Sequence, residues 1–94
     1  MGRDIRNYKV FQLSHKLTLR IYELTKRFPL KERFGLVSQM RRSAYSIPMN
    51  LVEGGARRSE TEFRYFVNIA RGSNAEIQYQ LELARDLAYI TNDE

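Results

Sequence analysis

Apolar residues recur every three or four positions in the first part of the chain, which is the spacing of one face of an α-helix. This stripe consists of Val10, Leu13, Leu17, Ile21, Leu24 and Phe28. Pro29 pushes the residue before it out of the helical conformation, so the helix must end near this point. The pattern therefore predicts a first helix over about residues 8–27.

A second helical pattern covers about residues 31–53 and ends at Gly54-Gly55, where a glycine can take the left-handed conformation of a helix C-terminus. Pro48 interrupts this pattern, because a proline inside a helix has no N–H and clashes with the carbonyl four positions earlier, at about 3 kcal/mol or more. We expect a kink near residues 44–48 or a break into two short helices. Ser46 would cap the second piece or bond to the freed carbonyl.

A third, long helix is predicted over about residues 60–90. Ser59 and Glu62 have the spacing of a capping box, in which the hydroxyl and the carboxylate each accept a bond from a backbone N–H of the first turn. This helix has apolar positions on two opposite faces, and each face must be covered. Two shorter helices can cover only one of them, so the chain does not close its own core. The small residues at positions 72–75 predict a close crossing with a neighbouring helix.

The second apolar face of this helix predicts an interface with another subunit. Its large members are Tyr65, Ile69, Tyr79 and Leu83. The three helices follow one another through short connections, so neighbours run antiparallel. We therefore expect one all-α domain over residues 1–94, an antiparallel helical bundle that assembles into an oligomer.

Composition narrows the class of protein. The 94 residues contain no cysteine and one histidine, His15, so disulfides, thiol chemistry, histidine triads and two-histidine metal sites are excluded within one chain. The N-terminus has no apolar leader segment, and no run approaches the roughly 20 apolar residues of a membrane span. We expect a cytoplasmic protein without a cofactor.

Candidate catalytic groups are few. Gly54-Gly55 lacks the lysine and hydroxyl that follow in a phosphate-binding loop. Ser46, Asn50 and Glu53 form a small polar cluster in an otherwise apolar helix. Its favoured interpretation is a hydrogen-bonded network that satisfies the backbone around Pro48, and its alternative is an active site. The sequence thus predicts a protein that is not an enzyme.

Charge is distributed unevenly, which changes the functional picture. The net charge is +5, but residues 1–58 carry +9 and residues 59–94 carry −4. This asymmetry indicates either a nucleic-acid surface or a positive helix packed beside a negative one. The candidate nucleic-acid-binding residues are the pairs Arg41-Arg42 and Arg57-Arg58, since guanidinium groups bind phosphates bidentately.

Many positions from Phe28 onward resemble one known family. They are Phe28, Pro29, Glu32, Phe34, Gly35, Leu36, Ser38, Gln39, Met40, Arg41, Arg42, Ser43, Ala44, Ser46, Ile47, Pro48, Asn50, Glu53, Gly54, Arg58, Ser59, Glu62, Phe63, Phe66, Ile69, Ala70, Gly72, Ser73, Glu76, Gln80 and Leu81. The resemblance covers about residues 6–91. The chain looks like the four-helix-bundle proteins encoded by intervening sequences within bacterial 23S ribosomal RNA genes. It is more distantly similar to the accessory protein of diversity-generating retroelements.

The resemblance implies a bundle assembled into a ring, typically a homopentamer, with a basic surface that binds nucleic acid and with no catalysis. The retroelement relative implies a reverse transcriptase and its RNA as partners. Family members usually continue into a fourth helix, whereas this sequence stops at Glu94. We expect that the sequence is truncated or that a neighbouring subunit replaces that helix. The functional prediction is an oligomeric protein that binds RNA or a ribonucleoprotein, and the alternative is a scaffold that binds no nucleic acid.

Overall fold

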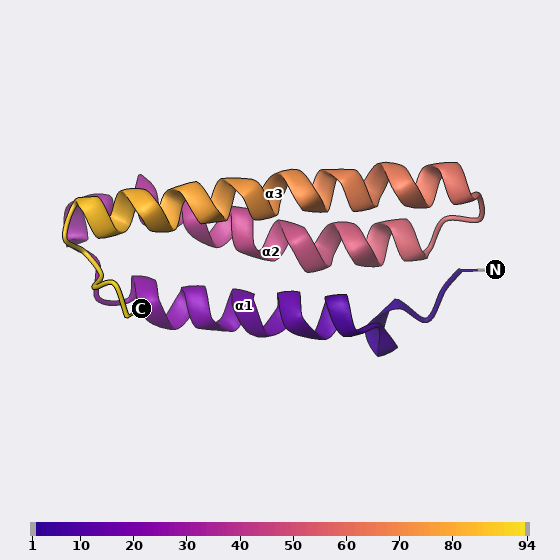
Figure 1. Cartoon of the computed structure of the whole chain (residues 1–94), viewed down its shortest axis with the longest axis horizontal. Helices are drawn as coiled ribbons and strands as arrows, with labels where there is room; N and C mark the ends of the chain where they lie inside the picture. Colours follow the sequence, from indigo (N-terminus) through magenta and orange to yellow (C-terminus); the bar gives the residue numbers. More distant parts are fainter. Residues whose placement is uncertain (1, 94) are drawn as a thin grey trace.

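The computed structural model describes residues 2–93, which fold into an antiparallel bundle of three long helices (Figure 1). These are α1 (Lys9–Thr25), α2 (Leu36–Gly55) and α3 (Glu60–Asp86). Two short 3-10 helices, η1 (Ile5–Asn7) and η2 (Leu30–Glu32), precede α1 and α2. Residues 2–93 contain no strand, and the predicted all-α class is confirmed.

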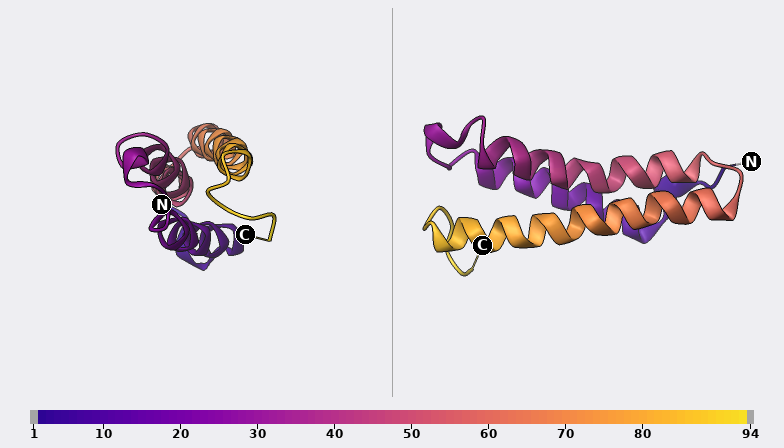
Figure 2. Two further views of the ribbon diagram at one scale, coloured as in Figure 1. Left: turned by 90° about the vertical axis from the view of Figure 1, so that its left-hand side faces the viewer. Right: turned by 90° about the horizontal axis from the view of Figure 1, so that it is seen from above.

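Helix α2 is the element on which the other two helices pack. Seen end-on, α1 and α3 lie against different sides of α2 (Figure 2). No Cα atom of α1 comes within 8 Å of one in α3. The bundle is therefore an open arrangement in which the two outer helices are held through the middle one.

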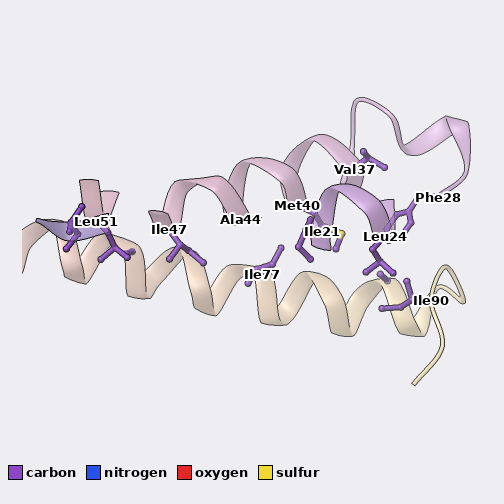
Figure 3. Packing of buried hydrophobic residues seen from close by; sticks show 13 residues of the cluster. Ile21, Leu24, Phe28, Val37, Met40, Ala44, Ile47, Leu51, Ile77 and Ile90 are labelled. Carbon is purple, nitrogen blue, oxygen red and sulfur yellow. The ribbon is translucent and has the colours of Figure 1, made fainter. Parts of the chain in front are cut away.

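The core follows the predicted helical stripes. Its most deeply buried large side chains are Ile21, Met40 and Ile77, which come from α1, α2 and α3 and meet in one layer (Figure 3). Other buried members on these stripes are Leu24, Phe28, Val37, Ala44, Ile47, Leu51, Ala70 and Ala84. The first two residues of the first stripe, Val10 and Leu13, are not buried in the core, because they are 52% and 54% exposed. The core thus closes around the middle of the bundle and stays open near the start of α1.

Pro48 does not break α2, which runs unbroken from Leu36 to Gly55. The carbonyl that a proline at this position leaves without an N–H donor is that of Ala44. The Oγ1 of Thr18, in α1, lies 3.1 Å from this oxygen and 2.9 Å from the Ser14 carbonyl of its own helix. The predicted break is therefore wrong, and the freed carbonyl is served by a hydroxyl of the neighbouring helix rather than by Ser46.

The two glycines at the end of α2 serve close packing rather than a left-handed turn. Both lie inside the helix, both are buried, and neither has a positive φ. A Cβ added at Gly54 would lie 2.8 Å from the Cβ of Phe66, and one at Gly55 would lie 3.0 Å from the Cβ of Ile5. The predicted left-handed C-terminus is thus wrong, because the backbone of α2 approaches its neighbours too closely for a side chain.

Helix α2 begins five residues later than the sequence pattern suggests. Residues Leu30–Glu32 form the separate turn η2, and the Glu32 carboxylate then accepts a 3.2 Å bond from the N–H of Leu36. The same carboxylate accepts a 2.8 Å bond from the hydroxyl of Tyr89, beyond the end of α3. Glu32 therefore caps α2 and ties the α1–α2 connection to the C-terminal segment.

Helix α3 begins as predicted and ends four residues early. The Oγ of Ser59 accepts a 3.0 Å bond from the N–H of Glu62. The return bond of a full capping box is not present in the described chain, and the Glu62 carboxylate lies 3.9 Å from Arg57 instead. At the other end, Ala88 has a φ of 64° and the N–H of Tyr89 bonds to the carbonyl of Ala84, which is a Schellman stop.

The early stop changes the place of Ile90. This residue is the last of the predicted helix over residues 60–90, but it lies beyond the left-handed turn and is buried in the core (Figure 3). The second face therefore consists of residues before the turn.

We expect Gly54→Ala to destabilise the protein and Gly72→Ala to stabilise it. The first change forces Cβ atoms of α2 and α3 apart and should lower the free energy of unfolding by about 1–3 kcal/mol. At Gly72 no atom of the described chain lies within 4 Å of the added Cβ, so in the single chain, at low protein concentration, better helix propensity should raise the free energy of unfolding by roughly 1 kcal/mol. Urea denaturation of both variants measures these changes. A loss at Gly72 that varied with protein concentration would contradict the second expectation and reveal a helix of another subunit there.

Stability should fall in acid through Glu32. The hydroxyl of Tyr89 and the N–H of Leu36 lower the pKa of this carboxyl below 4.5. A group with a lowered folded pKa stabilises the fold above its unfolded pKa, and this contribution is lost as the pH falls through the folded value. Glu32→Gln should therefore flatten the pH dependence of unfolding at pH values below the ordinary pKa of a glutamate, about 4.3. The matched control is Glu82→Gln, whose carboxylate makes no ion pair or hydrogen bond in the described chain. Equal curves for the two variants would contradict the assignment.

Candidate nucleic-acid interface

The first predicted arginine pair is split between the inside and the outside of the bundle. The Nε of Arg41 donates a 2.9 Å bond to the Oγ1 of Thr25, and its guanidinium carbon lies 4.6 Å from the centre of the Tyr22 ring. These contacts fasten the second turn of α2 to the last turn of α1. Arg42 is exposed and makes no ion pair or hydrogen bond in the described chain. Only Arg42 of this pair is available to a ligand.

The second pair is divided in the same way. Arg57 forms a 2.8 Å ion pair with Glu53, approaches Glu62 and stacks 4.9 Å from the ring centre of Phe66. These contacts fix the turn between α2 and α3. Arg58 is exposed and has no ion pair within residues 2–93.

The four arginines do not form one patch. Neighbouring residues on a helix point about 100° apart, so Arg41 and Arg42 face different sides. The first pair is also about 20 Å of helix length away from the end of α2 at Gly55, beyond which the second pair lies. Of the four candidate residues, Arg42 and Arg58 are therefore exposed cations at separate places. Arg41 and Arg57 make contacts that stabilise the fold.

Helix α1 carries a basic stripe that the sequence reasoning missed. The residues are Lys9, Lys16 and Arg20, which are seven and four positions apart. Both spacings return to nearly the same face of a helix, so the three side chains form a line along α1. All three are exposed and form no ion pair in the part of the chain that is described. The signal was present in the sequence as a heptad-like spacing of cations beside the apolar stripe.

The polar cluster around Pro48 is a hydrogen-bonded network between two helices. The Nδ2 of Asn50 donates to the carbonyl of Ser46 at 2.7 Å and lies 3.0 Å from its Oγ. The hydroxyl of Ser73, in α3, lies 3.0 Å from the same Oγ. The predicted network is present for Ser46 and Asn50. Glu53 stands outside it because its carboxylate pairs with Arg57.

The predicted interface residues share an uncovered face of α3. Tyr65 and Tyr79 are each 61% exposed, and Ile69 and Leu83 are half-buried. Gly72 lies on the same face with open space above it, so it does not serve a helix crossing within this chain. The predicted close crossing is therefore absent at Gly72 within the described chain.

An apolar groove lies between α1 and α3. Its volume is about 500 Å³, and α2 supplies Ile47 and Leu51 to its lining. The outer helices contribute Val10, Leu13, Ser14, Leu17, Val67, Ala70, Arg71, Asn74, Ala75 and Gln78. The groove lies where the backbones of α1 and α3, which both pack on α2, stay more than 8 Å apart at their Cα atoms.

Two further properties concern the described residues alone. None of their helices is long and apolar enough to cross a membrane. Their histidine, aspartate and glutamate side chains nowhere gather in groups of three that would hold a metal ion.

Comparison with known proteins places the chain in a family. No curated protein matches it. The family model of the 23S rRNA-intervening sequence protein matches residues 6–94, which is nearly the whole chain. The chain belongs to the 23S rRNA-intervening sequence protein family.

Proposed function

We propose that this protein is a non-enzymatic helical-bundle protein that binds RNA, or a ribonucleoprotein, through a basic surface. The observation that carries the proposal is the stripe of Lys9, Lys16 and Arg20 along α1, whose side chains are exposed and form no close ion pair in the described chain. Regularly spaced cations on one helix face neutralise successive phosphates and release counterions, and this release drives binding to a nucleic-acid backbone. Because RNA is the ligand, we also propose a cytoplasmic location.

We further propose that the protein acts as a homo-oligomer. The uncovered face of α3 with Tyr65, Ile69, Tyr79 and Leu83 supports this, because large apolar side chains on a regular helix face are typical of a surface that another subunit covers. A ring such as a pentamer would repeat the α1 stripe around the assembly. Repetition strengthens the field that each stripe produces.

A scaffold that binds other proteins but no nucleic acid is the second candidate. The same uncovered face of α3 favours it. The two candidates differ in one measurable property, since only the first predicts binding that weakens strongly with salt.

RNA affinity measured against salt concentration tests the first proposal. We expect the triple change Lys9→Gln, Lys16→Gln and Arg20→Gln to weaken binding and to reduce the logarithmic salt slope by about 2–3, at roughly 0.7–0.9 per phosphate contact. The matched control is Arg42→Gln with Arg58→Gln, which removes exposed cations at other places. Equal losses of RNA affinity in both variants would show that overall positive charge, and not the α1 stripe, is responsible for binding. If the unchanged protein shows no salt-dependent RNA binding, the first proposal is wrong and the scaffold function remains.

Molar mass by light scattering on a sizing column tests the assembly. We expect a mass of several chains for the unchanged protein. Tyr79→Lys should shift it toward the monomer, because a charge would be buried in the interface. Leu19→Lys is the control, since Leu19 is 56% exposed on α1 and lies outside the proposed interface. A monomeric unchanged protein, or the same shift in both variants, would contradict the interface.

A further inference from the structure

The two most exposed large apolar side chains of the described residues lie on the connection between α1 and α2. Leu30 is 81% exposed and Phe34 is 86% exposed. In Figure 3 this connection, between Phe28 and Val37, loops out away from the core cluster. The fold therefore leaves most of the surface of both side chains in solvent.

Hydrogen bonds hold the connection in one shape. The N–H groups of Glu32, Arg33 and Gly35 bond to the carbonyls three positions earlier, at 2.9 to 3.0 Å. The Glu32 side chain is bonded at both oxygens, to Leu36 and to Tyr89. The Phe34 ring is therefore presented on a pre-organised turn, so little conformational freedom is lost when a ligand binds it.

Positive charge surrounds the exposed ring. The guanidinium carbon of Arg33 lies 5.4 Å from the ring centre of Phe34. Lys31 is exposed on the same turn, and this turn follows in sequence the helix that carries the basic stripe. The one acid of the turn, Glu32, is engaged by its two hydrogen bonds.

We propose that Phe34 is a stacking platform for an unpaired base of RNA, with Lys31 and Arg33 neutralising the phosphates beside that base. The inference rests on the RNA binding proposed above and names unpaired nucleotides as the ligand at this end of the surface. Unpaired bases stack on exposed aromatic rings and on arginine planes, whereas bases in a duplex are stacked on each other and inaccessible.

The order of residues on the turn favours a nucleic acid over a lipid surface. Three charged residues, Lys31, Glu32 and Arg33, separate Leu30 from Phe34. Insertion of both apolar side chains into hydrocarbon would carry these charges toward it, at a high desolvation cost. A base needs only the Phe34 ring, and the neighbouring cations then meet phosphates in water.

The test compares a single-stranded RNA containing 2-aminopurine with the same RNA annealed to its complement. We expect Phe34→Ala to weaken binding of the single strand about 5-fold to about 100-fold and to abolish stacking-induced quenching of 2-aminopurine. Duplex affinity and the salt slope should not change, because no charge is lost. Phe34→Trp should retain the affinity, and the neighbouring control Leu30→Ala should behave like the unchanged protein.

Three results would overturn the inference. An unchanged affinity of Phe34→Ala, with the salt slope intact, would remove the stacking site and leave the proposed RNA binding in place. Equal RNA affinities combined with loss of binding to anionic phospholipid vesicles, or with a fall in molar mass, would assign the turn to a membrane or to a second copy. A lack of RNA binding by the unchanged protein would overturn the proposed function together with this inference.

Discussion

The requirement that α2 pack against two helices at once governs this structure. No Cα atom of α1 comes within 8 Å of one in α3, so the closest backbone contacts of the three helices are those that α2 makes with its two neighbours. Its sequence meets the requirement with large residues where there is space, such as Met40, and with very small ones where backbones approach, such as Ala44 and Gly54. The openness of the groove between α1 and α3 follows directly from this plan.

Periodicity predicted the helices and most of the core, because a buried stripe depends on local spacing alone. It failed where the outcome depends on residues far apart in the sequence. The start of α2 is set by Glu32, whose position also depends on Tyr89, 57 residues away. The glycines at the end of α2 were assigned to a turn because a sequence does not show that Ile5 and Phe66 press on them.

The candidate surface shows the same limit. Arginine pairs are conspicuous in a sequence, yet Arg41 is bound by Thr25 and Arg57 by Glu53. The partner of Arg41 depends on how α1 and α2 cross, whereas Glu53 stands four positions before Arg57 and could be identified from spacing alone. The stripe of Lys9, Lys16 and Arg20 was less conspicuous but could be found from spacing alone, because all three lie on one helix. Side-chain type was thus a weaker guide to availability than position on a helix face.

The bond between Thr18 and the Ala44 carbonyl has a consequence for how α1 and α2 find their alignment. Apolar packing between two helices tolerates sliding, since one aliphatic side chain can replace another. The Ala44 carbonyl, which Pro48 leaves without an N–H donor, does not tolerate such sliding. An alignment that places Leu17 or Ile21 opposite it would leave a buried acceptor without a donor, at a cost of about 1–3 kcal/mol. Pro48 therefore helps to fix the alignment of the two helices. Because it has no backbone N–H, the Ala44 carbonyl needs a donor from α1, and only a residue with such a donor can lie opposite it.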